Sequence, residues 1–130
     1  RDEARALGLR TGSRVLRLQV LGEGAGQPLH VSERWFPLPR FDGLQALVEA
    51  SGSITEAFRT LGVDDYTRRE SRVSARMPEA DVAEWLRQPV TRPALLVTSV
   101  NVDHTGKPIE FATTWFAGDR VTLTVQHDDH

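Results

Sequence analysis

The chain has 130 residues, of which 39% are hydrophobic and 26% charged, and it contains no cysteine. This size predicts one domain whose core needs no disulfide or metal, and the lack of cysteine excludes thiolate zinc sites, iron–sulfur clusters and cysteine nucleophiles. Sixteen basic against eighteen acidic residues give a net charge of −2, which argues against a free-standing nucleic-acid binder. No apolar run reaches the ~18 residues of a membrane span, so we expect a cytoplasmic protein that does not bind membranes.

The first residues indicate one module of a longer protein. Arg1 is not an initiator methionine, and residues 1–7 have the composition of the end of a helix or linker, which Gly8 interrupts. We expect residues 1–130 to form a single domain and a further segment to precede it in the natural gene.

A β-hairpin is expected next in the chain. Residues 15–21 and 29–36 are rich in apolar residues and read as strands, and a long glycine-rich loop over 22–28 connects them. Pro37 ends the second strand because proline cannot donate a hydrogen bond to a sheet.

Three helices are expected in the middle of the chain. Apolar residues at i, i+3 and i+4 predict the first within 44–51, and Ser53 with Glu56 forms a capping box that starts the second. The third lies between Pro78 and Pro89. Its expected buried face is Val82, Trp85 and Leu86.

The remaining segments are predicted strands at 66–76, 95–102, 108–116 and 121–125, of which the last alternates cleanly and closes the sheet. Adjacent strands joined by short turns indicate an antiparallel sheet with helices grouped on it, so the predicted fold class is α+β.

Catalytic motifs are not found. The glycine-rich loop lacks the lysine of a P-loop and a following helix, and no Gly-x-Ser-x-Gly elbow occurs. The histidines show no paired helical spacing, and residues 127–130 are better explained as a solvated tail than as a cation site. The sequence therefore predicts no catalytic site, no cofactor and no metal.

Arginines within predicted strands are the stronger signal. The period-two rule places Arg69 and Ser71 on one face of the strand 66–76, and Arg68 on a polar face that meets water. A guanidinium beside a hydroxyl suits a phosphate or carboxylate ligand. The alternative is that Arg69 pairs with an internal carboxylate such as Glu33 or Glu110.

Charged residues interrupt three other strands as well. Glu110 shares a strand face with Thr114 and Phe116, while Arg17 and Glu33 lie in the two strands of the hairpin. These side chains either converge on one polar pocket for a small anionic or hydroxylated ligand, or face solvent separately on a one-sided sheet.

Several motifs together resemble a known family. The segment Gln27-Pro28-Leu29, the stretch 65–76, the turn at 106–110 and the sequence Gly118-Asp119-Arg120-Val121 resemble the UTRA domain, the effector-binding half of HutC-type regulators in the GntR family. The resemblance covers essentially the whole chain, and the sequences of these motifs are most similar to the PhnF-like branch.

The resemblance implies a chorismate-lyase-like fold, in which an antiparallel sheet and flanking helices enclose a ligand pocket. It implies a homodimer that senses a small anionic metabolite, such as a phosphorylated sugar or a phosphonate. DNA would be bound only by a winged helix-turn-helix domain that precedes this chain. A chorismate-lyase-like enzyme and a dimerisation scaffold with a non-functional pocket stay as alternatives.

The resemblance also implies roles for particular residues. Arg17 corresponds to the first arginine of an R-x-R phosphate-binding strand, and Gln19 stands where the second would be. It favours a pocket role for Arg69 and Glu110, which we expect to line the same cavity. The expected effector-binding residues are Arg17, Glu33, Arg69, Ser71, Glu110, Thr114 and Phe116.

Overall fold

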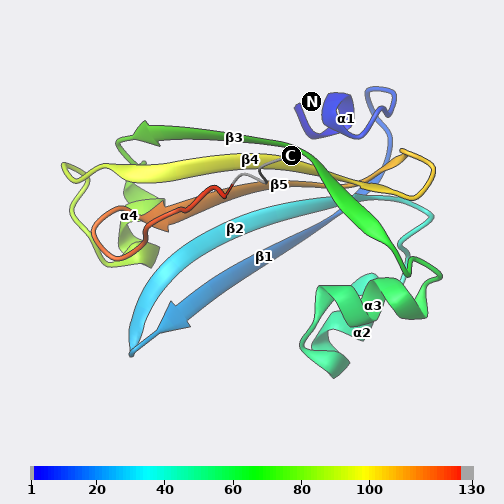
Figure 1. The fold of residues 1–130 in the computed structure, drawn as a ribbon, viewed down its shortest axis with the longest axis horizontal. Helices are drawn as coiled ribbons and strands as arrows, with labels where there is room; N and C mark the ends of the chain where they lie inside the picture. The colour runs from blue at the N-terminus through cyan, green and yellow to red at the C-terminus, as the bar shows by residue number, and fades with distance from the viewer. Residues whose placement is uncertain (1, 127–130) are drawn as a thin grey trace.

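An antiparallel sheet of five strands organises the computed structural model, which describes residues 2–126 (Figure 1). The strands are ordered β1-β2-β5-β4-β3 across the sheet. Their bounds are β1 Val15–Gly24, β2 Gln27–Pro37, β3 Tyr66–Arg76, β4 Ala94–Asp103 and β5 Pro108–Ala117. The helices are α1 Asp2–Ala6, α2 Leu44–Ser51, α3 Ile54–Thr60 and α4 Ala80–Leu86. The α+β prediction is confirmed.

The sheet has two chemically different faces, which follow from the strand registers and the alternation of side chains. One, the Glu110 face, carries Leu18, Arg34, Asn101 and Glu110; the other, the Glu33 face, carries Arg17, Glu33, Phe111 and Arg72.

The α2–α3 pair covers one end of the Glu110 face (Figure 1). The Oγ atom of Ser53 accepts a hydrogen bond from the backbone N–H of Glu56 at 3.2 Å, so half of the predicted capping box forms. Below the helices, the rings of Phe36, Phe41 and Phe58 are fully buried, with centroids 5.2–6.1 Å apart. Each such aromatic pair adds about 0.5–1.5 kcal/mol beyond the burial of its surface.

The Glu33 face is covered at its two ends by other helices. At one end α4 packs Leu86 and Val82 against Val31 and Trp115, while α1 contacts β5 towards the opposite end. Trp85 was predicted on the buried side of α4, but it is 41% exposed because Leu86 and Ala83 occupy the contact with the sheet.

The connection of the first hairpin is shorter than predicted. Instead of a loop over 22–28, β1 continues to Gly24 and β2 starts at Gln27. Ala25 and Gly26 both have positive φ, as a two-residue hairpin turn requires to match the twist of its strands.

The predicted strand at 121–125 is wrong. This segment has no sheet pairing, and Val121 follows a turn in which its N–H bonds the carbonyl of Ala117 at 3.1 Å. The physical reason is the strand order: β5 already has β2 and β4 as neighbours, so the residues after β5 find no free edge beside it. Residues 127–130, expected to be a solvated tail, lie outside the described residues.

No helix in residues 2–126 has the length and apolar character that crossing a membrane requires.

Candidate functional site

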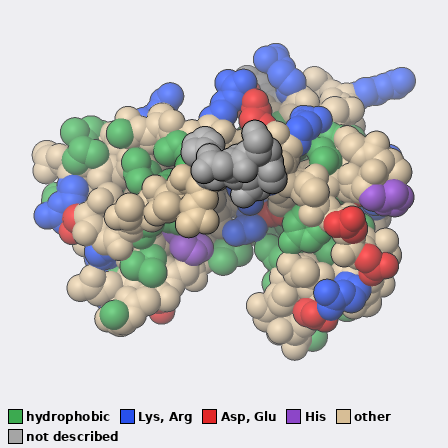
Figure 2. All heavy atoms as spheres, viewed as in Figure 1, with side chains coloured by type: hydrophobic (Ala, Val, Ile, Leu, Met, Phe, Trp, Pro, Cys, Tyr) green, Lys and Arg blue, Asp and Glu red, His purple; other side chains and the backbone are tan. Residues whose placement is uncertain are grey.

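A hollow of about 430 Å³ lies between the Glu110 face and the α2–α3 pair, and we call it the Glu110 hollow. In Figure 2 the surface is indented between the helix pair at the lower right and the strands to its left. Its volume is in the range of small-molecule sites. Its lining residues are Val20, Arg34, Val48, Gly52, Ile54, Thr55, Tyr66, Arg68, Asn101 and Glu110.

The carboxylate of Glu110 is the centre of this hollow. Its side chain is 3% exposed; Oε2 accepts a hydrogen bond from Nη1 of Arg34 at 3.0 Å, and Oε1 accepts one from Nδ2 of Asn101 at 2.9 Å. A buried carboxylate needs such partners because desolvation would otherwise strongly disfavour its charge. The Arg34 guanidinium and the Asn101 amide therefore hold Glu110 in one orientation.

Arg68 extends the network to the edge strand β3. Its Nε donates to Oδ1 of Asn101 at 2.8 Å, and its Nη1 donates to Oγ of Ser71 at 3.1 Å. Arg34 also donates from Nε to Oγ of Ser32 at 3.2 Å. A continuous chain of polar contacts thus crosses the sheet from β2 through β5 and β4 to β3.

Two guanidinium groups keep donors free for a ligand. Among residues 2–126 no partner is found for Nη2 of Arg34 or Nη2 of Arg68. With Glu110 as the one acidic group in the lining, the two arginines give the hollow a net charge of +1. The hydroxyls of Thr55 and Tyr66, 2.8 Å apart, add neutral hydrogen-bonding groups on the helix side.

A β-bulge in β3 decides which arginine faces the Glu110 hollow. Arg68 is opposite Asn101 and Glu70 is opposite Val100, so Arg69 is the extra residue. A bulge shifts the alternation of side chains by one residue. Arg68 and Ser71, three residues apart, therefore share the Glu110 face, contrary to the period-two prediction.

Arg69 lies elsewhere. It lines a second hollow of about 340 Å³ on the Glu33 face, the Arg69 hollow, together with Asp2 and Arg5 of α1. The expectation that Arg69 and Glu110 line one cavity is wrong, because the bulge places Arg69 on the side away from Glu110.

The other predicted site residues are divided between the two faces. Arg17 and Glu33 form an ion pair of 3.4 Å on the Glu33 face, on the other side of the sheet from Glu110. Thr114 and Phe116 share the face of Glu110 but lie further along β5 and do not line its hollow. Of the seven residues, Glu110 lines the Glu110 hollow and Ser71 binds Arg68 at its rim.

Sequence reasoning missed Arg34, Arg68, Asn101 and Tyr66. The position of Arg34 could have been predicted, because it stands two residues from both Ser32 and Phe36, which are buried, and so shares their face of the strand. Arg68 had none, because the pattern of residues in β3 does not reveal the bulge.

His30 lies on β2, on the same face of the sheet as Arg34. Burial, and secondarily the charge of Arg34, lowers the pKa of His30 below its usual value. Its ring lies 5.5 Å from that of Phe116, and its Nδ1 is buried without a hydrogen-bond partner among the described residues.

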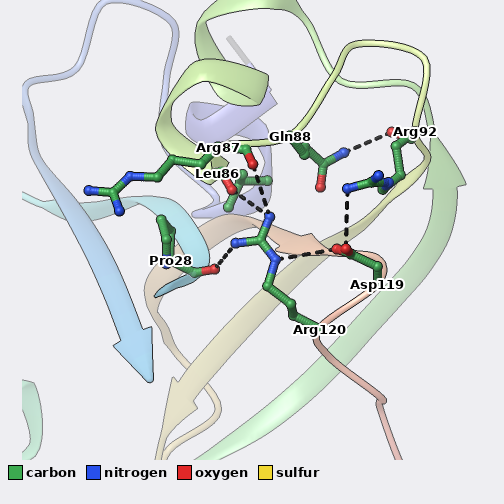
Figure 3. A network of polar contacts seen from close by, with 7 residues as sticks. All are labelled: Pro28, Leu86, Arg87, Gln88, Arg92, Asp119 and Arg120. Carbon is green, nitrogen blue, oxygen red and sulfur yellow. Dashed lines mark hydrogen bonds and ion pairs between the residues drawn. The ribbon is translucent and has the colours of Figure 1, made fainter. Parts of the chain in front are cut away.

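A third hollow of about 430 Å³ is lined by Arg87, Arg92 and Arg120, of which Arg120 is structural (Figure 3). The guanidinium of Arg120 donates to the carbonyls of Pro28 and Leu86, both at 2.6 Å, and to Asp119 at 3.3 Å. Asp119 also pairs with Arg92 at 3.2 Å. These donors are already used within the fold, so Arg120 joins chain segments and is not poised for a ligand.

Within residues 2–126 no group of three or more histidine or acidic side chains is arranged to hold a metal ion.

Comparison with known proteins identifies the fold and the family. Residues 1–122 match the UTRA domain. An uncharacterised HTH-type transcriptional regulator of Rhizobium meliloti is 34% identical over 123 residues, which are 95% of this chain and 50% of that protein. The chain spans about half the length of the curated relatives it matches.

Two solved structures have the same fold. PhnF from Mycobacterium smegmatis superposes with a TM-score of 0.87 at 27% identity, covering 97% of this chain and 56% of that one. The C-terminal domain of YurK from Bacillus subtilis superposes with a TM-score of 0.85, covering 97% of this chain and 86% of that one; at 16% identity this likeness concerns the fold alone.

The cited relatives are named as transcriptional regulators, which favours a regulatory role over the enzyme alternative. With the domain match over nearly the whole chain and the PhnF-like fold, the chain belongs to the UTRA domain family.

Proposed function

We propose that this chain is the effector-sensing domain of a bacterial transcriptional regulator and that its effector is a small anionic metabolite bound in the Glu110 hollow. The observation that carries the proposal is the pair of guanidinium groups of Arg34 and Arg68, each with an unused terminal nitrogen at the same hollow. Guanidinium forks bind phosphate and carboxylate oxygens with charge-assisted hydrogen bonds.

The lining suggests how such an effector would lie. A phosphoryl or phosphonate group would bind between Arg34 and Arg68, where the positive charge is concentrated. A hydroxylated remainder, such as a sugar, would reach Thr55 and Tyr66 on the helix side. A phosphorylated sugar, a phosphonate or a similar compound has this chemistry.

The output is the DNA affinity of an attached domain. PhnF and the Rhizobium protein are named as HTH-type regulators. The fold of this chain is similar to that of the C-terminal domain of YurK. A winged helix-turn-helix domain on the N-terminal side would accordingly bind DNA in the cytoplasm. An effector changes that binding only if it prefers one arrangement of the two domains, and typical couplings are about 1–3 kcal/mol.

We also propose that the regulator is a homodimer through this domain. β1 and β3 are the two edges of the sheet, and the alternating segment 121–125 is unpaired. Unpaired edges and an unpaired alternating segment can be satisfied by a second copy of the chain.

Thermal unfolding against phosphorylated sugars, phosphonates and inorganic phosphate tests the effector site. A compound at ~100 times its dissociation constant adds ~2.7 kcal/mol of stability and raises the melting temperature. We expect the shift in the wild-type chain to be lost in Arg68→Ala and kept in Arg72→Ala, a matched control whose side chain is 77% exposed on the other face.

If the shift survives in Arg68→Ala, the Glu110 hollow is not the anion site. If no compound binds while the chain is dimeric in analytical ultracentrifugation, the dimerisation scaffold with a non-functional pocket replaces the sensor.

A further inference from the structure

We propose that the bulge in β3 links the Glu110 hollow mechanically to α1, with Arg68 responding to the hollow and Arg69 passing the change to the helix. α1 and the α2–α3 pair lie on opposite sides of the sheet, with β3 running past both (Figure 1). The inference rests on the proposed function only for the identity of the signal, and the link itself is testable without an effector.

On the Glu110 side, Arg68 is fastened to the sheet through its own side chain. It bonds Asn101 on β4 at 2.8 Å and Ser71 on β3 at 3.1 Å, and Asn101 in turn bonds the buried Glu110. An anion that binds the free Nη2 of Arg68 changes the hydrogen bonds of this guanidinium to Asn101 and Ser71. Because Arg68 is the residue at which the bulge begins, a shift of its side chain also moves the backbone of β3 at the bulge.

The bulge is the point where β3 can change discretely. The ladder with β4 is regular from Glu70 to Arg76 and shifts between Arg68 and Glu70. Moving the bulge toward the start of β3 would exchange the faces of Arg68 and Arg69, since a one-residue slip reverses the direction of each side chain. Because both residues are arginines, the Glu110 hollow keeps its positive charge in either register.

On the Glu33 side, Arg69 faces α1. The Arg69 hollow is lined by Asp2, Arg5 and Ala6 of α1 and by Phe111 of β5 beneath. In the described chain the side chains of Arg69 and Asp2 have no hydrogen-bond or ion-pair partner. They carry opposite charges, so a small movement of the bulge can bring them together or separate them.

α1 is weakly held and suits a responding element. It has five residues, too few for an independently stable helix, and it is anchored by the buried side chains of Ala4 and Leu7. Segments with few buried contacts open at low free energy. α1 also lies at the N-terminal end of the domain, on the side from which the DNA-binding domain is proposed to enter.

Hydrogen exchange of the α1 amides measures the link directly. The N–H groups of Leu7, Gly8 and Leu9 bond carbonyls within α1 at 3.0, 3.1 and 2.8 Å, so their exchange rates by NMR report whether the helix is formed. We expect Arg68→Ala to accelerate their exchange about fivefold or more, the lower end of typical coupling between sites. We expect Arg69→Ala alone to change it little, because among the described residues the side chain of Arg69 has no bonded partner on α1 to lose.

The double variant separates a link from two independent effects. Once Arg69→Ala has cut the link, adding Arg68→Ala should cause no further acceleration. Arg76→Ala is the matched control, since it removes an exposed arginine from the regular part of the same strand. Unchanged α1 exchange in Arg68→Ala, or effects that multiply in the double variant, would overturn the proposal.

A second arm uses methylphosphonate and inorganic phosphate as probes. A compound that raises the melting temperature should alter α1 exchange in the wild-type chain, and in Arg69→Ala it should still bind while leaving α1 exchange unaltered. Binding without any α1 response contradicts the link and leaves the sensor intact. An α1 response to Arg68→Ala with no binding of either probe supports the link and counts against the anionic effector.

Discussion

Arg68 and Arg69 are chemically identical neighbours with different surroundings. Arg68 bonds Asn101 at 2.8 Å on the Glu110 face, whereas Arg69 lies beside α1 on the Glu33 face. The position of one backbone bulge decides this difference. At the scale of single residues, the local backbone conformation therefore decides which of the two arginines faces Glu110, because their side chains are the same.

Asp103 shows how strongly the fold can hold a single charge. Its carboxylate accepts hydrogen bonds from the hydroxyl and N–H of Thr105 at 2.7 and 2.9 Å and from the N–H of Lys107 at 3.0 Å, and it pairs with Arg40 at 2.9 Å. These hydrogen bonds, those of Thr105 first, hold the pKa of Asp103 far below its ordinary value.

The depressed pKa of Asp103 predicts an acid-sensitive contribution to stability. The folded chain keeps Asp103 ionised while the unfolded chain protonates it near pH ~4, so the contribution is present above that pH and lost as the pH falls further. We expect Asp103→Asn to lower the melting temperature at neutral pH. Below pH ~4 the melting temperature of this variant should decrease less with falling pH than that of the wild-type chain. Asp64→Asn, an exposed control, should follow the wild-type curve; parallel acid curves for Asp103→Asn and wild type would contradict this role.

At the scale of elements, β3 combines a regular ladder with one extra residue. From Glu70 to Arg76 each residue has its partner on β4, and on the other side of Arg69 the partners are Arg68 and Asn101. Arg69 is thus the residue whose removal leaves both parts of the ladder in register.

Deletion of Arg69 should therefore be tolerated. We expect the shortened chain to fold, with a free energy of unfolding within about 1 kcal/mol of wild type, because no buried contact or ladder partner is lost. Inter-strand NOEs between Arg68 and Asn101 should persist. Deletion of Val73 from the regular ladder is the matched control and should be far more damaging, since it turns the following residues to the wrong face. Equal damage from both deletions would show that the bulge is required for folding.

At the scale of the whole molecule, Arg120 joins parts of the chain that are far apart in sequence. Its side chain is 14% exposed, and its guanidinium donates hydrogen bonds to the carbonyl of Pro28 at the start of β2 and to that of Leu86 at the end of α4 (Figure 3). The carbonyls at a helix end lack partners within the helix, so Arg120 also caps α4.

Replacing Arg120 should lower the free energy of unfolding more than replacing Arg87, which lines the same hollow. We expect Arg120→Ala to lower the free energy of unfolding by about 3 kcal/mol, because the carbonyls of Pro28 and Leu86 lose a charged donor. Arg120→Lys should recover only part, since one ammonium group cannot reproduce the planar fork. Arg87→Ala, whose guanidinium points away from the network in Figure 3, should change little. Urea unfolding measures all three, and a loss below about 1 kcal/mol in Arg120→Ala would contradict the joining role.

The sequence by itself determined the fold class, the family and most of the elements. Apolar alternation in the strands and the Ser53 cap of α3 act over a few residues, so their signals are readable locally. Glu110 was also recognisable, because a carboxylate within an apolar strand must find partners.

Only the tertiary structure decided which residues surround Glu110. The bulge at Arg69, the unpaired segment 121–125 and the separation of Arg17 and Glu33 from Glu110 depend on which strands are neighbours. Strand order and register are set by long-range packing between segments far apart in sequence, and a one-residue shift of register moves a side chain to the opposite face of the sheet.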